Sequence, residues 1–202
     1  MLRYRADIRT LAFVSIYFSL TAFTWVYFEQ LSWYTITALV IACAQFSFFG
    51  AVITHNTIHC PIFKNRKMNI LFQVILSLTY GHPVSSFVPG HNFSHHKYTQ
   101  TDKDVMRTYK ARFRWNFLNH ALFRNVVSSD ILKWEVRFAL DMRKEKPAWF
   151  RQYMVEMAIV MGIKVALAVI NWKLFILLNG YSTIRLSCKE VIVKSISTCF
   201  EC

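Results

Sequence analysis

Two long stretches near the start of the chain carry no charged side chain. They cover residues 11–28 and 31–54, and only Glu29 and Gln30 separate them. At about 1.5 Å per residue, helices of these lengths reach roughly 27 and 36 Å, which is enough to cross a hydrocarbon core of about 30 Å. A connection this short forces the two helices to run antiparallel. The pattern therefore predicts a hairpin of two membrane-spanning helices.

Two further apolar stretches follow. Residues 70–80 are apolar but too few to span a bilayer, so we expect an interfacial or re-entrant helix there. Residues 157–178 form a third predicted span, which could lead into the start of a fourth. Lys164, Asn171 and Lys173 interrupt this stretch. The predicted fold is an all-α integral membrane protein with a helical hairpin, interfacial helices and a third span.

Basic residues flank the predicted hairpin on one side only. Arg3, Arg5 and Arg9 precede the first span, and Lys64, Arg66 and Lys67 follow the second. The short connection holds no Lys or Arg. Because cytoplasmic loops are enriched in these residues, the N-terminal end and the segment after residue 59 are predicted to face the cytosol.

Composition supports a membrane protein. The 202 residues are 54% hydrophobic with a net charge of +13, whereas a soluble domain is usually about 45–50% apolar. Residues 97–151 combine basic and aromatic side chains. Nucleic acid could be bound by such a pattern, but the neighbouring spans favour amphipathic helices on anionic lipid, and no nucleic-acid partner is expected.

The odd number of cysteines, five at scattered positions, argues against a disulfide framework.

Five of the seven histidines fall in two short clusters. The first is His55-Asn-Thr-Ile-His59 and the second is His91-Asn-Phe-Ser-His95-His96. Residues at i and i+4 share a helix face, so His55 can act with His59, and His91 with His95. His96 is rotated by about 100° from His95 on a helix, which suits two metal ions better than one. The clusters therefore predict a metal site, with a dinuclear one as the natural form.

Residue type alone does not identify the metal, because imidazole ligands suit iron, copper and zinc. Zinc hydrolases with an H-E-x-x-H pattern are not supported, since no glutamate follows His55 or His91. His82 and His120 stand alone and are read as ordinary polar residues. Asp102 and Asp104 could orient the clustered histidines, but a solvated loop is the favoured interpretation.

The two clusters together resemble the first two histidine boxes of the membrane fatty acid desaturase superfamily. H-N-T-I-H closes a membrane hairpin, and G-H-N-F-S-H-H-K-Y-T-Q follows about thirty residues later. The resemblance implies a di-iron centre on the cytosolic side, with His55, His59, His91, His95 and His96 as ligands. It also implies that dioxygen and two electrons from an external donor, cytochrome b5 or ferredoxin, desaturate a lipid or acyl-thioester substrate. The implied host is the endoplasmic reticulum, a plastid or a bacterial inner membrane, where the chain could form oligomers.

The superfamily's third box, H-x-x-H-H or Q-x-x-H-H, has no match, since no histidine follows His120. We therefore expect a desaturase-like domain over residues 1–180 and an atypical tail over 181–202. Two explanations are open. The chain is a truncated or mis-spliced reading of a longer gene, which is the favoured interpretation and would leave it inactive, or it is a genuine short variant that has lost catalysis or completes its site through a partner. Alternatives are a hydroxylase or ketolase of the same superfamily, acting on fatty acids or carotenoids, or a non-catalytic membrane partner of a full-length desaturase.

Overall fold

The computed structural model describes residues 1–88, 96–98, 101–104 and 116–178. Every named element in these ranges is a helix, and their β pairing is an isolated bridge between Leu2 and Phe63. The chain divides into two compact units. Of the described residues, 1–82 and 158–178 form the first unit, and those between 83 and 157 form the second. The predicted tail, 181–202, lies outside the described residues.

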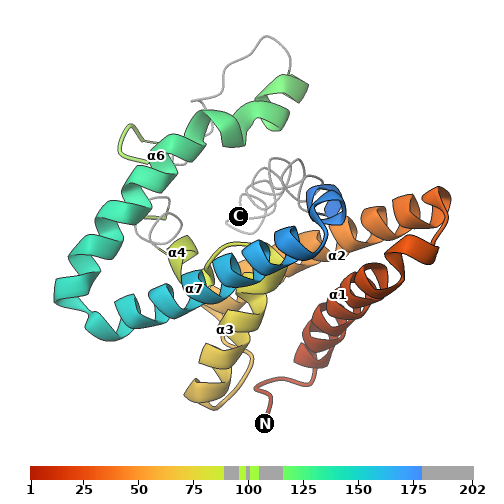
Figure 1. Ribbon diagram of the computed structural model, residues 1–202. Helices are drawn as coiled ribbons and strands as arrows, with labels where there is room; N and C mark the ends of the chain where they lie inside the picture. Colours follow the sequence, from red (N-terminus) through yellow and green to blue (C-terminus); the bar gives the residue numbers. More distant parts are fainter. Residues whose placement is uncertain (89–95, 99–100, 105–115, 179–202) are drawn as a thin grey trace. The chain divides into compact units, whose positions relative to one another are not determined.

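The predicted hairpin is confirmed. Helix α1 covers Asp7–Tyr27, the short 3-10 helix η1 covers Phe28–Gln30, and α2 covers Trp33–His59 (Figure 1). Ser32 begins α2, where its Oγ accepts a hydrogen bond from the backbone N–H of Thr35 at 3.3 Å. Phe13 packs between Phe46 and Phe49, with ring centroids 6.1 and 5.1 Å away. Both helices are long and apolar enough to cross a membrane.

Helix α3, Arg66–Tyr80, occupies the predicted third apolar stretch and starts four residues before it. Asn65 caps its first turn by accepting from the backbone N–H of Lys67 at 2.8 Å. The far end of α3 packs on α2, where Ser47 Oγ donates to the carbonyl of Thr79 at 3.2 Å. That contact lies roughly three turns before α2 ends at His59. It holds the end of α3 against the middle of the second span.

Gly81 ends α3 and connects it to a distant part of the sequence. Its φ of 75° is left-handed, which glycine adopts without steric penalty. Lys164 Nζ donates a hydrogen bond to the Gly81 carbonyl at 2.6 Å. This cation therefore lies at the C-terminal, partially negative end of α3. The lysine that interrupts the third predicted span thus serves as a cap for another helix.

The third span is helix α7, and its predicted bounds were wrong. It covers Pro147–Ile170 rather than residues 157–178. Proline is favoured in the first helical turn, and the buried Glu156 has hydrogen-bond partners that let it lie inside an apolar helix. At the other end Asn171 interrupts the helix, and its side chain accepts from the backbone N–H of Leu174 at 3.0 Å. Residues 172–178 form a separate helical segment.

The second unit contains α4, Val84–Val88, α5, His96–Tyr98, and α6, Asn116–Glu145. Tyr153, near the start of α7, donates from its hydroxyl to Glu135 of α6 at 3.0 Å. Trp149 stacks on Tyr153 at 5.5 Å and meets Phe138 edge-on at 5.2 Å. These contacts hold α6 and the first turns of α7 together within the second unit.

The close contact between α2 and α3 makes Gly50 sensitive to substitution. A Cβ at Gly50 would lie 2.9 Å from Thr79 Oγ1, whereas a Cβ at Gly162 of α7 meets nothing within 4 Å. We predict that Gly50→Ala lowers the free energy of unfolding by about 1–3 kcal/mol through overpacking. Gly162→Ala should leave it unchanged or raise it by about 0.5–1 kcal/mol. Thermal unfolding in detergent, followed by circular dichroism, measures the stability of both variants. Equal changes in stability for the two would contradict the close contact between Gly50 and Thr79.

Candidate functional site

The first histidine cluster lies in the last turns of α2. The helix continues past the apolar stretch because no breaker occurs before Pro61, and the N–H of Cys60 still donates to the Asn56 carbonyl at 2.8 Å. The rings of His55 and His59 have centroids 5.0 Å apart, at an interplanar angle of 67°. The prediction that these two imidazoles share one helix face is therefore confirmed.

The two imidazoles differ in exposure. His55 is half-buried, and its Nε2 atom is enclosed by protein, whereas His59 is exposed. His55 Nδ1 lies 3.4 Å from Oδ1 of Asn56. An amide oxygen can only accept, so this contact is a hydrogen bond in the tautomer that carries its proton on Nδ1. In that tautomer the lone pair lies on Nε2, the atom that could bind a metal.

The second cluster is only partly covered by the described residues. His91 and His95 lie outside them, and His96 is described only through its backbone at the start of α5. The prediction that these three histidines act together with His55 and His59 stays a prediction. Beyond α5, Thr101 N–H donates to the Tyr98 carbonyl at 2.8 Å, and Asp104 N–H donates to the Thr101 carbonyl at 3.0 Å.

Charged residues just after the second cluster have defined surroundings. Lys97 and Lys103 place their ammonium groups 5.3 and 5.9 Å from the ring centroid of Tyr98, within reach of a cation–π interaction. Asp102 is exposed, whereas Asp104 is fully buried. The solvated-loop interpretation fits Asp102 and is wrong for Asp104. A buried carboxylate needs partners, so Asp104 is the stronger candidate for an orienting role.

Sequence reasoning missed the buried carboxylate of Glu156. It is fully buried in α7 and accepts three hydrogen bonds. Ser85 donates from its backbone N–H at 2.9 Å and from its Oγ at 2.8 Å, and Gln152 Nε2 donates at 3.0 Å. Ser85 belongs to α4, which ends at Val88, shortly before the second cluster begins. Glu156 thus fixes the helix that leads into that cluster.

The described residues bring together no group of three or more His, Cys, Asp or Glu side chains able to hold a metal ion. Three of the five predicted ligands lack a described side chain, so this result concerns only His55 and His59 of the predicted set.

A model of the protein family described as fatty acid desaturase matches residues 31–184. This range covers well over half of the chain and contains both histidine clusters. The chain belongs to the fatty acid desaturase family. No curated protein and no solved structure gives a significant match.

Family membership and the helices agree on the general class of the protein. The fatty acid desaturase match begins with α2 and extends past α7. It therefore contains two of the three helices of membrane-spanning length found among the described residues. This desaturase-family chain is therefore an integral membrane protein of a desaturase- and hydroxylase-type oxidoreductase superfamily. The histidine clusters resembling the first two boxes lie at positions 55–59 and 91–96 of the matched range.

The role of Glu156 can be tested in this desaturase-family protein. Glu156→Ala removes the acceptor for both Ser85 hydrogen bonds and should lower the free energy of unfolding by about 1–3 kcal/mol. Hydrogen–deuterium exchange in α4 should speed up as well. Glu145→Ala, at the exposed end of α6, is the matched control and should change neither quantity. Unchanged exchange in α4 of Glu156→Ala would refute the anchoring role.

Proposed function

We propose that this protein introduces a double bond into a fatty acyl chain. The substrate is a membrane lipid or an acyl thioester, the oxidant is dioxygen, and the electrons come from an external donor, cytochrome b5 or ferredoxin. The observation that carries the proposal is the pair of histidine clusters inside the family match, the first with both imidazoles on one face of α2. His55, His59, His91, His95 and His96 are the proposed ligands of a di-iron centre.

The described part of the proposed site fits iron. Imidazole nitrogen is an established iron ligand, and the Asn56 contact is a hydrogen bond in the tautomer of His55 that leaves Nε2 able to bind a metal. When bound, iron supplies the activation of dioxygen that breaking an unactivated C–H bond requires. The chain's own contribution is to hold neutral imidazoles at fixed positions.

The placement of the first cluster suits a lipid substrate. His55 and His59 lie at the end of a helix long enough to cross the bilayer, so they are expected close to the membrane surface. An acyl chain in the bilayer and a donor at the surface can both reach such a position. The basic residues before α1 and after α2 favour the cytosolic or stromal side for this end.

Several contacts support the second cluster. Glu156 anchors α4 through Ser85, and Asp104 is a buried carboxylate in the turn after α5. We propose that these two carboxylates hold the two ends of the segment from Ser85 to Asp104, which carries His91, His95 and His96. Neither carboxylate is proposed as a metal ligand.

Iron content is therefore the first readout of the proposed site. Protein purified from iron-supplemented cells should approach about two irons per functional unit by elemental mass spectrometry. His55→Ala and His91→Ala should each retain less than about a tenth of that iron, because each removes a ligand. His120→Ala, which removes a histidine outside both clusters, should retain all of it.

Turnover provides a second readout. Expression in a host lacking the corresponding desaturase should yield an unsaturated acyl product that disappears in His91→Ala and persists in His120→Ala. A product that persists unchanged in His91→Ala would refute the proposed site. A hydroxylated product in place of an alkene would reassign the reaction within the same superfamily.

A further inference from the structure

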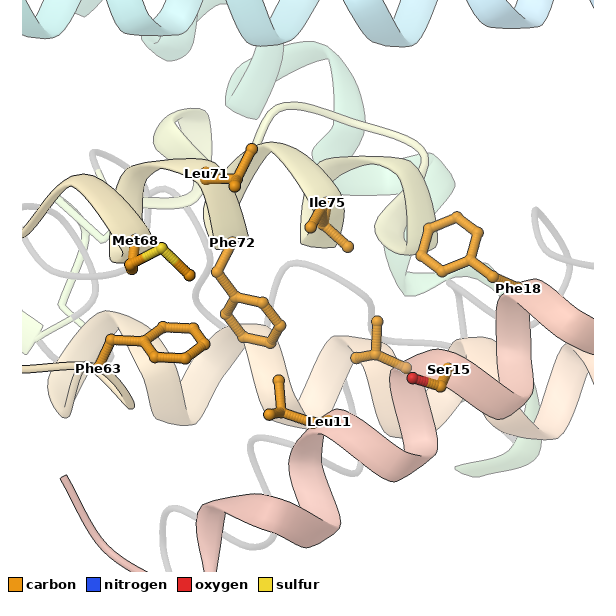
Figure 2. Close-up of a pocket in the computed structure, with 9 residues that line it drawn as sticks. Leu11, Ser15, Phe18, Phe63, Met68, Leu71, Phe72 and Ile75 are labelled. Carbon is orange, nitrogen blue, oxygen red and sulfur yellow. The ribbon is translucent and has the colours of Figure 1, made fainter. Parts of the chain in front are cut away.

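An apolar pocket opens between α1 and α3, apart from the histidine clusters. Its volume is about 440 Å³, within the range of roughly 300–1,000 Å³ that is usual for sites of small organic ligands. Figure 2 shows Leu11 of α1 and Phe72 of α3 pointing toward one another across it. Val14 and Phe72 are buried and form its floor, whereas Met68 and Leu71 are exposed at its rim. The lining is aliphatic and aromatic apart from Ser15.

Backbone contacts fix the segments around this pocket. The N–H of Arg3 donates to the Ile62 carbonyl at 2.7 Å, and the N–H of Lys64 donates to the Met1 carbonyl at 3.2 Å. The side chain of Asn69 accepts from the N–H of Phe63 at 2.9 Å and donates to its carbonyl at 2.8 Å. The N-terminal segment, the turn after α2 and the first turns of α3 are therefore joined.

This joining brings two groups of basic residues to one end of the pocket. The N-terminal group is Arg3, Arg5 and Arg9, and the second group is Lys64, Arg66 and Lys67. All six side chains are exposed. Lys64 directly follows Phe63, and Lys67 directly precedes Met68, and both neighbours line the pocket. Asp7 is the carboxylate nearest in sequence to the first group, and its Oδ2 accepts from the N–H of Tyr4 at 3.1 Å.

We propose that this pocket binds one molecule of an anionic phospholipid. One acyl chain lies against Val14 and Phe72, and the phosphate-bearing headgroup meets the two basic groups. The bound lipid is a resident of the membrane, separate from the acyl substrate of the proposed reaction. An apolar pocket beside a basic surface complements a molecule with both an acyl chain and a negative charge. Inorganic phosphate would pair with the basic residues but would leave the apolar pocket unfilled.

A lipid competition experiment tests this site. The full chain is placed in nanodiscs with equal amounts of phosphatidylglycerol and phosphatidylcholine, and the lipids that stay bound are identified by native mass spectrometry. We expect about a fivefold preference for phosphatidylglycerol. Lys64→Gln/Arg66→Gln/Lys67→Gln should abolish that preference. The control Lys133→Gln/Arg137→Gln/Lys144→Gln removes the same charge from exposed positions of α6 and should preserve it.

A second pair of variants tests the acyl chain. Ser15→Trp fills the pocket and should lose the bound lipid, whereas Ser19→Trp, at an exposed position of α1 outside the lining, should retain it. Circular dichroism verifies that both variants are helical, and Ser15→Leu provides a smaller substitution if the tryptophan prevents folding.

Three results would overturn the proposal. The first is an equal loss of preference in both triple variants, which would show general attraction to a basic membrane face. The second is unchanged lipid retention in both Ser15→Trp and Ser15→Leu. The third is release of phosphatidylglycerol by millimolar inorganic phosphate, which would assign the basic residues to a soluble anion.

Discussion

The scarcity of water inside a bilayer is the constraint on which this structure depends, because polar groups there must find partners within the protein. Hydroxyl groups in the helices meet this demand locally. Several donate to the carbonyl four residues earlier: Thr24, Thr37, Thr54 and Ser77. Two polar side chains instead join different elements: Ser47 bonds to Thr79, and Lys164 bonds to Gly81. These two bonds mark places where helices meet.

Much of the fold could be predicted from the pattern of charges and apolar residues. The hairpin followed from two charge-free stretches and a two-residue connection, because length and hydrophobicity suffice to identify a span. The third span was predicted to begin at residue 157, whereas α7 begins at Pro147 and includes the buried Glu156. Its burial depends on Ser85, which is distant in the sequence, and a periodic pattern carries no information about such a partner.

The candidate site was predictable to a smaller extent. Spacing alone placed His55 and His59 on one face, because an α-helix fixes the relation between positions i and i+4. It did not distinguish the buried Asp104 from the exposed Asp102 two positions earlier. That difference is set by tertiary packing in a turn, where no helical or strand period relates neighbouring side chains. The combined arrangement of all five histidines stays a prediction.

The bond between Lys164 and Gly81 has a consequence for how the protein is made. A lysine deep in an apolar helix resists transfer from the translocon into lipid unless an acceptor is available. Helix α3 is synthesised before α7, so the carbonyl of Gly81 can already be in place when α7 is inserted. The acceptor on α3 is therefore synthesised before the lysine of α7 that requires it. A permuted gene encoding α7 first would present this lysine to the membrane with no acceptor yet synthesised.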